Sequence, residues 1–177
     1  LIEKGRENLL LQSNQFDTTW LQNGVSVTSG QSGYDGSNDA WLLSKSSPSG
    51  QIGNISTYSG VFTQSVYMKA NSLNWVAMNN SGIGSSGTYF DLQNGVIGTE
   101  GGNVIKSEIT PVGNGWYKCS QVINTTASLT RIYPADGNGD VSGTSGSIYI
   151  QDAQLESSLV ATPYIETGAS SAQAGIL

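Results

Sequence analysis

Histidine is absent from this chain of 177 residues, and cysteine occurs only once, at Cys119. Without histidine the chain lacks the most common general base at neutral pH and the most common transition-metal ligand. Ser-His-Asp and Cys-His catalysis are therefore excluded within these residues, and a single cysteine excludes an internal disulfide bond. Cys119 stands in the alternating run 115–123, where we expect a small buried side chain.

Basic side chains are also few, with seven Lys and Arg against thirteen Asp and Glu and a formal net charge of −6. Because phosphate binding needs a basic stripe that this composition does not supply, we expect no nucleic-acid partner. No apolar run approaches the roughly 18 residues that cross a bilayer, so we expect no membrane partner. Ser, Thr, Asn, Gln and 23 glycines supply the polarity instead, which favours a neutral ligand rich in hydroxyl groups.

Long stretches with a helical apolar stripe are missing as well, and short alternating segments recur between turns rich in Gly, Ser and Asn. This pattern predicts an all-β fold, an antiparallel β-sandwich of jelly-roll type. We expect one module over residues 1–166 and a C-terminal linker toward a following domain over 167–177. Asn-Gly pairs at 93–95 and 113–115 are typical of hairpin turns. The predicted strands are 8–13, 24–30, 38–46, 60–70, 74–80, 87–95, 103–113, 115–123, 128–135 and 146–156.

Aromatic residues give the strongest indication of binding, because the apolar C–H faces of sugar rings stack on flat aromatic side chains while amides and Arg bind the hydroxyl groups. Strand alternation places Trp75 with Asn79 on one face, Arg131 with Tyr133 on another, and Tyr67 beside polar neighbours. We predict that these five residues bind carbohydrate. The alternative is that the aromatic rings fill the core of the sandwich, as we expect for the other three tryptophans, Trp20, Trp41 and Trp116.

One group of acidic residues lies in a Gly-rich loop, where Asp136, Asn138 and Asp140 alternate as in an oxygen-rich calcium loop. The match to an EF-hand fails, because Val141 and Ser147 stand where that loop needs its glycine and its bidentate glutamate. A different oxygen cage and an acidic turn held by local Asx hydrogen bonds both remain as interpretations.

A second group consists of Asp17 near the start and Asp152 near the end of the chain. If the terminal strands of the sandwich lie side by side, the two carboxylates converge around a hard cation. The alternative places Asp17 in a turn and Asp152 exposed at a strand end. No pair of carboxylates stands out as a general acid and base, so we expect no enzymatic activity.

Six segments taken in order resemble a known group of proteins: 8–20, 64–70, 89–98, 112–120, 139–156 and 162–167. They resemble the jelly-roll, lectin-like modules of bacteriophage tail fibres and other phage structural proteins. Those modules are similar to the concanavalin-like and galactose-binding-like sandwiches that serve as carbohydrate-binding modules beside polysaccharide-degrading enzymes. The resemblance spans Asn8 to Thr167.

The resemblance implies a non-catalytic module on a virion surface that binds glycan or polysaccharide, contacts other virion subunits and forms a homotrimer in its parent protein. In related jelly rolls the opening segment and an Asp of the last strand meet at a structural calcium ion. Carried over, this implies calcium ligation by Asn14, Asp17 and Asp152. Two alternatives stay open: an accessory module of a secreted polysaccharide-degrading enzyme, and a structural spacer or decoration that binds only virion proteins.

Overall fold

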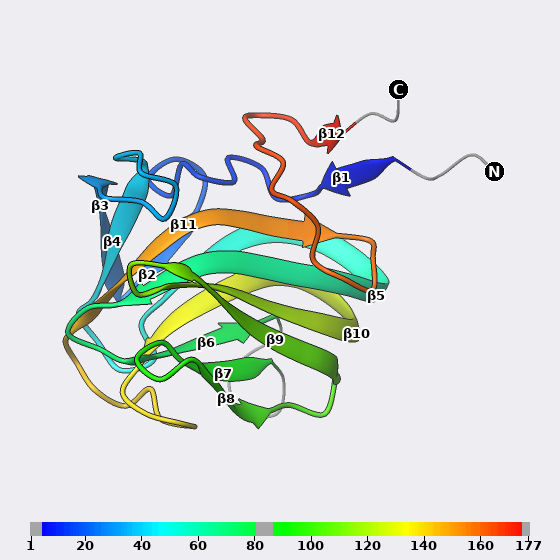
Figure 1. Ribbon diagram of the computed structural model, residues 1–177. Helices are drawn as coiled ribbons and strands as arrows, with labels where there is room; N and C mark the ends of the chain where they lie inside the picture. The colour runs from blue at the N-terminus through cyan, green and yellow to red at the C-terminus, as the bar shows by residue number, and fades with distance from the viewer. Residues whose placement is uncertain (1–4, 81–86, 175–177) are drawn as a thin grey trace.

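The computed structural model describes residues 5–80 and 87–174, in which ten strands form one antiparallel sheet that bends over into two packed layers (Figure 1). Two strands of 20 residues each, β5 (Gln51–Ala70) and β10 (Trp116–Ala135), pair along most of their length and bend from one layer into the other. The predicted antiparallel β-sandwich is therefore confirmed. The other strands are β1 (Arg6–Asn8), β2 (Leu21–Asn23), β3 (Val25–Gln31), β4 (Ala40–Lys45), β6 (Trp75–Asn79), β7 (Thr88–Asp91), β8 (Val96–Glu100), β9 (Val104–Gly113), β11 (Ser147–Glu156) and β12 (Ala172–Ala174).

Each layer contains one half of β5 and one half of β10. The first layer has the order β3, β4, β11, β5, β10, β9, and the second has the order β2, β5, β10, β6, β7, β8. Within the first layer the Cα register pairs Lys118 of β10 with Tyr67 of β5. Within the second layer it pairs Arg131 of β10 with Gly53 of β5 and with Asn79 of β6.

The apolar core lies between the layers and follows from strand alternation, because every second side chain points inward. Cys119 is fully buried there, as predicted, and burial raises the pKa of its thiol. Trp20 and Trp41 also lie in this core, whereas Trp116 is buried outside the main apolar cluster. The side chains with no exposed surface include Leu43, Ile52, Met68, Val76, Met78, Phe90, Ile123, Ile132, Ile150 and Leu155.

A β-bulge in β10 changes which residues face outward in the second layer. The register of β10 against β5 shifts between Ala127 and Leu129. Before this bulge Ile123 points into the core, and after it Ile132 does. Because an extra residue reverses the alternation, Arg131 lies on the outer face of the second layer.

The ends of the described chain meet in a separate two-stranded ribbon, where β1 pairs antiparallel with β12 (Figure 1). In the segment predicted as a linker, Thr167 is buried, its amide donates to Ser13 Oγ and its hydroxyl donates to the Leu10 carbonyl. The described residues of this segment therefore contact the sandwich. Among the described residues, no helix has the length and apolar character needed to cross a membrane.

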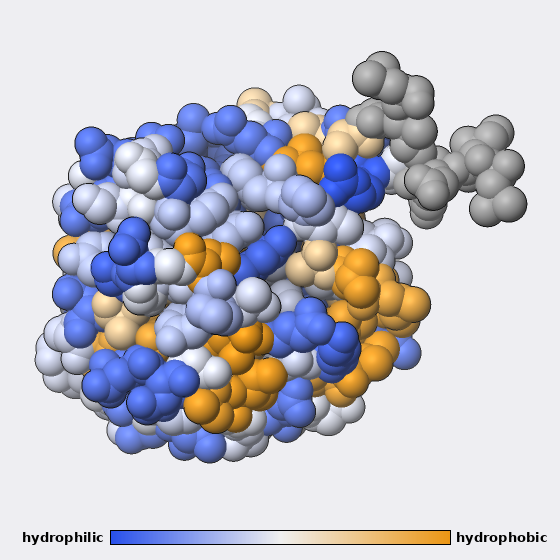
Figure 2. Space-filling model, viewed as in Figure 1, coloured by the Kyte–Doolittle hydropathy of each residue, from blue (hydrophilic) through white to orange (hydrophobic). Residues whose placement is uncertain are grey.

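Several large apolar side chains are exposed, in patches separated by hydrophilic surface (Figure 2). Val96 lies on β8, Ile105 on β9, and Leu159 and Val160 follow β11. Scattered exposure of this kind is common on soluble domains and needs no partner to explain it.

Candidate functional site

Two irregular segments lie over the outer face of the first layer and leave a cavity of about 510 Å³. We call the segments strap A (residues 32–39, between β3 and β4) and strap B (residues 157–168, after β11), and the space the strap cavity. Tyr34 of strap A stacks on Tyr67 of β5, and the Thr162 carbonyl of strap B accepts a hydrogen bond from Lys118 Nζ at 2.8 Å. The cavity is lined by Asn14, Tyr34, Asp35, Asp39, Tyr67, Gln151, Asp152, Pro163, Tyr164 and Glu166.

A β-bulge in β11 brings Asp152 to this cavity. The register of β11 against β5 shifts between Gln151 and Gln154, and Asp152 has a φ of 53°. Ile150 before the bulge and Ala153 after it both point into the core, so the bulge reverses the alternation and frees Asp152 from the ladder. Its side chain is 7 % exposed. The alternative of an exposed carboxylate at a strand end is therefore wrong.

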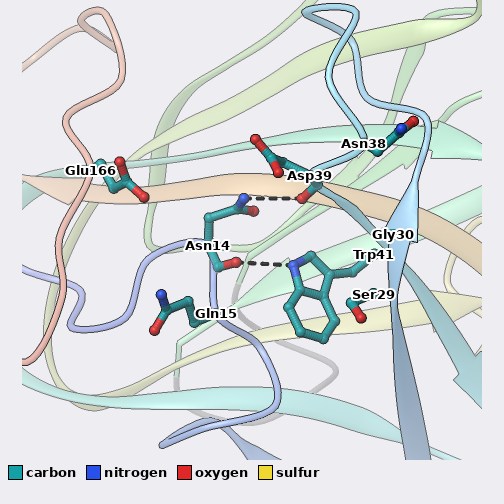
Figure 3. A pocket seen from close by; sticks show the side chains of 8 residues that line it. All are labelled: Asn14, Gln15, Ser29, Gly30, Asn38, Asp39, Trp41 and Glu166. Carbon is teal, nitrogen blue, oxygen red and sulfur yellow. Dashed lines mark hydrogen bonds between the residues drawn. The ribbon is translucent and has the colours of Figure 1, made fainter.

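Asn14 connects the pieces around the cavity. Its Nδ2 donates to the Asp39 carbonyl at 3.0 Å, and its Oδ1 accepts from the Asp152 amide at 3.0 Å. Its backbone carbonyl accepts from Trp41 Nε1 at 2.9 Å (Figure 3). Asn14 and Glu166 also line a smaller pocket of about 250 Å³, and Figure 3 shows Asn14 between Glu166 and Trp41. One amide side chain thus fixes strap A against β11.

The rings of Tyr34 and Tyr67 are stacked in parallel, with centroids 3.7 Å apart and an interplanar angle of 3°. Tyr34 Oη donates to Asp152 Oδ2 at 2.7 Å, which fixes the outer ring of the pair. The ammonium group of Lys118 lies 5.5 Å from the Tyr67 ring centroid. Together these contacts build a flat aromatic wall at one side of the cavity.

Negative charge dominates the electrostatics of the cavity. The pKa of Asp152 is raised to about 6, mainly by burial and also by the charges of Asp35, Glu166 and Asp39, while the hydrogen bond from Tyr34 opposes the rise. Burial also raises the pKa of the Tyr34 phenol well above its usual value. A hydrogen bond from the Ser37 hydroxyl lowers the pKa of Asp35, which keeps that carboxylate ionised.

The residues predicted to hold calcium are only partly brought together. Asn14 and Asp152 are in contact, but Asp17 is exposed and does not line the cavity. The Asn14 side-chain oxygen already accepts a hydrogen bond, and residues 5–80 and 87–174 contain no cluster of three or more carboxylates that suits a metal ion. The predicted set therefore does not fit a calcium ion as arranged here, and calcium binding stays a prediction.

The Gly-rich loop between β10 and β11 is organised by an ammonium group. Lys45 Nζ lies 2.6 Å from Asp136 Oδ2 and donates to the Val141 carbonyl at 2.9 Å. Asp140 Oδ1 accepts from both the amide and the hydroxyl of Ser142. These contacts correspond to the interpretation of an acidic turn with local Asx hydrogen bonds rather than to an oxygen cage.

The five predicted carbohydrate-binding residues lie on two opposite faces. Only Tyr67 lines the strap cavity. Trp75, Asn79, Arg131 and Tyr133 share the outer face of the second layer, where Trp75 is half-buried, and Asn79 and Tyr133 are buried. Burial raises the pKa of the Tyr133 phenol, and the neighbouring charge of Arg131 opposes this rise.

Sequence reasoning missed most of the cavity, because its residues lie in straps without a strand period. A readable signal existed only in β11, where the apolar residues change phase between Ile150 and Ala153. Such a change indicates a bulge next to Asp152. The residues missed are Tyr34, Asp35, Asp39, Gln151, Pro163, Tyr164 and Glu166.

Comparison with known proteins gives matches among solved structures. No protein-family model and no curated protein matches the chain. The enzymatically active domain of tailspike protein 4 of Bacteriophage CBA120 is 18% identical, with a TM-score of 0.43; the match covers 84% of this chain but 21% of the tailspike domain. The chain thus spans about a fifth of that protein's length.

Two carbohydrate-binding proteins are similar as well. A family 29 carbohydrate-binding module is 10% identical over 87% of this chain and 92% of its own, with a TM-score of 0.47. A xylan-binding domain from Paenibacillus barcinonensis is 11% identical over 85% of this chain and 91% of its own, with a TM-score of 0.41. At these low identities the three likenesses concern the fold and not the function.

Proposed function

We propose that the strap cavity binds a saccharide unit of a cell-surface or extracellular polysaccharide and leaves it chemically unchanged. The observation that carries this proposal is a cavity of about 510 Å³ that combines tyrosine rings with amide and carboxylate groups. Its volume lies within the roughly 300–1,000 Å³ of typical ligand pockets. Tyr34 and Tyr164 offer apolar ring surface, while the carboxylates of Asp35, Asp39 and Glu166 accept hydrogen bonds from sugar hydroxyl groups.

The test is binding of the purified chain to a panel of bacterial and algal polysaccharides, with two matched variants. Asp39→Asn removes a carboxylate that lines the cavity, whereas Asp17→Asn removes an exposed carboxylate outside it. Because hydrogen bonds to charged groups contribute about 1.5–3 kcal/mol, we expect Asp39→Asn to weaken binding about tenfold or more. Asp17→Asn should bind as the unchanged chain does. Equal binding by all three proteins would contradict the assignment of the site.

We also propose a structural calcium ion, as the sequence resemblance implies. The same panel, run with calcium and then with a chelator, tests it. Binding that is lost with chelator and restored by calcium supports a structural ion near Asn14 and Asp152. Binding that is unchanged by chelator removes calcium from the proposal and leaves the glycan site standing.

The absence of catalysis is also proposed and has its own assay. A raised carboxyl pKa, such as that of Asp152, is one feature of glycoside hydrolases, which pair a protonated acid with an ionised carboxylate. Tyr34 already donates to the Asp152 carboxylate, which supports a structural role for this group. Incubation with each bound polysaccharide should release no reducing ends. Release that Asp152→Asn abolishes would instead make the module a hydrolase.

We propose further that the parent protein is carried on a virion surface, next to other virion subunits and as a homotrimer. The support is the sequence resemblance to phage fibre modules. Labelling of purified particles with an antibody to the module tests the location, and light scattering of the parent protein tests the assembly. A polysaccharide-degrading domain in the same polypeptide would favour an accessory module of a secreted enzyme. Absence of binding to every polysaccharide would favour a structural spacer.

A further inference from the structure

A second concave surface lies on the outer face of the second layer, opposite the straps. It is a groove of about 190 Å³ between β2, β5 and β10. We call it the Arg131 groove. Its volume is below the roughly 300–1,000 Å³ of pockets that enclose a whole ligand, so it can take one unit of a longer molecule. Its lining residues are Leu21, Asn23, Gln51, Gly53, Leu129 and Arg131.

Strand register explains why a groove forms here. Gly53 is paired with Leu21 on one side and with Arg131 on the other. Since Gly53 has no side chain, the floor between these two longer residues is bare backbone. Leu21 is 49% exposed and Leu129 is partly buried, so the walls offer apolar surface.

The polar side chains of the groove are those of Asn23, Gln51 and Arg131. The ion pairs within the described residues join Lys45 to Asp136 and Lys106 to Glu108, so Arg131 takes part in neither, although its guanidinium hydrogen-bonds to Tyr133. No acidic residue lines the groove. The side-chain oxygen of Gln51 is buried out of reach of a ligand, whereas the Asn23 amide is exposed to the groove. A ligand that completes this site carries an anion and, close to it, a hydroxyl group.

Positive charge is not concentrated around Arg131. Lys69 and Lys118 both point to the outer face of the first layer, opposite the groove, and the Lys118 ammonium is bound to the Thr162 carbonyl. A single guanidinium group matches one carboxylate through two parallel hydrogen bonds. It does not match a densely sulfated polymer, which requires several cations.

We propose that the Arg131 groove binds a carboxylate-bearing sugar unit, such as a uronate within a polysaccharide. Its carboxylate pairs with Arg131, a hydroxyl group bonds to the exposed Asn23 amide, and the C–H face of the ring lies between Leu21 and Leu129. This site is separate from the strap cavity and takes a different class of sugar. The four carboxylates of the strap cavity repel a uronate, whereas no acidic residue lines the groove.

The experiment is a calorimetric titration of the full chain with oligogalacturonate and with the same oligosaccharide after reduction of its carboxyl groups. We expect the uronate to bind at least tenfold more tightly than the reduced form. Arg131→Gln and Arg131→Lys should each weaken uronate binding at least tenfold, because both variants lose the bidentate guanidinium donor. The matched control Lys69→Gln removes a charge from the other layer and should leave binding within twofold.

A further variant fills the groove without changing any charge. Gly53→Val should abolish uronate binding while Arg131 remains. Where this variant does not fold by circular dichroism, Gly53→Ala replaces it, because its Cβ would lie 3.5 Å from Arg131 Cγ in ordinary contact. A smaller loss of affinity, about threefold, is then expected.

Three results would overturn the proposal. One is equal affinity for the uronate and the reduced oligosaccharide, and another is unchanged uronate binding by Arg131→Gln. The third is equal binding of a poly-glutamate peptide, which would indicate a general anion or peptide surface. Asp39→Asn tests the strap cavity separately on the polysaccharide panel, whereas Asp17→Asn, which removes an exposed carboxylate outside both sites, should leave uronate binding unaffected. Failure of the groove therefore does not entail failure of the strap cavity.

Discussion

The two outer faces of the sandwich differ in how their polar groups are held. On the first layer, two straps cover the sheet and hold Tyr34, Asn14 and Asp152 in one hydrogen-bonded network around a cavity of about 510 Å³. On the second layer, the groove of about 190 Å³ is open sheet surface, and Arg131 stands at its side without an ion-pair partner within the described residues. The same pair of long strands runs through both layers. The contrast teaches that the added loops, rather than the sheet, determine how many hydrogen bonds hold the polar groups of a face and how acidic that face becomes.

The largest expected effect distinguishes the faces by pH. The pKa of Asp152 is raised to about 6 from an ordinary 3.8, so the folded state binds a proton more tightly than the unfolded state does. Stability of the unchanged chain therefore falls as pH rises from about 4 to about 6 and stays lower above that. Asp152→Asn lacks this titration, and Asn tolerates the positive φ. We expect the variant to be more stable by up to about 3 kcal/mol at pH 8 and equally stable at pH 4.

Urea denaturation of both proteins at pH 4, 6 and 8 measures this difference. A difference that does not change with pH would show that Asp152 is not the titrating group. Arg131→Gln on the second layer is the control, because its guanidinium stays charged over this range. Its stability relative to the unchanged chain should not depend on pH.

A second comparison uses one asparagine on each face. Asn14→Ala removes two side-chain hydrogen bonds that join strap A to β11, so we expect a loss of about 2 kcal/mol in the free energy of unfolding. Asn23→Ala removes an exposed side chain at the groove, and we expect a change within about 0.5 kcal/mol. Urea midpoints at pH 7 check both values. Similar losses in the two variants would mean that the straps are no more ordered than the open sheet.

The smallest effect is expected from one glycine on each face. In strap A, a Cβ on Gly33 would overlap the side-chain amide of Gln151, so Gly33→Ala should cost about 1 kcal/mol or more. In the groove, a Cβ on Gly53 would meet only ordinary contacts, so Gly53→Ala should change stability by less than about 0.5 kcal/mol. Thermal unfolding of the two variants distinguishes these cases. A lower melting temperature for Gly53→Ala than for Gly33→Ala would contradict the close packing of the strap.

Much of the fold could be predicted, because alternation and turn chemistry are local. The predicted strands 103–113 and 146–156 correspond to β9 and β11 within one residue at their starts. The predicted turn between β9 and β10 has positive φ at Asn114 and Gly115, as a two-residue hairpin turn requires.

Errors arose where tertiary pairing decided the structure. The predicted strand 8–13 is mostly a turn after β1, in which the Leu9 amide donates to the Leu155 carbonyl. The predicted strands 115–123 and 128–135 form one strand, β10, because the exposed polar residues between them pair with β5. The short strands β2 and β8 were not predicted at all.

The candidate site was harder to predict than the fold. Tyr67 was found because it belongs to an alternating strand. Tyr34 and Glu166 lie in segments with no period, and only the folded chain brings them within one cavity. Arg131 was predicted as a ligand-binding residue, but its position beside a groove depends on the bulge in β10 and on the missing side chain of Gly53.

The pairing of β1 with β12 has a mechanical consequence. Arg6 is paired with Ala174 and Asn8 with Ala172, so a pulling force applied at Arg6 and Ala174 loads the rungs of this ribbon one after another. Because the hydrogen-bonded pairs break singly in this geometry, the two strands separate at low force. The long pair of β5 and β10 takes no part in this ribbon, so the two faces of the sandwich keep their shape while the ribbon opens. Under force, the ribbon should therefore open before the sandwich itself unfolds.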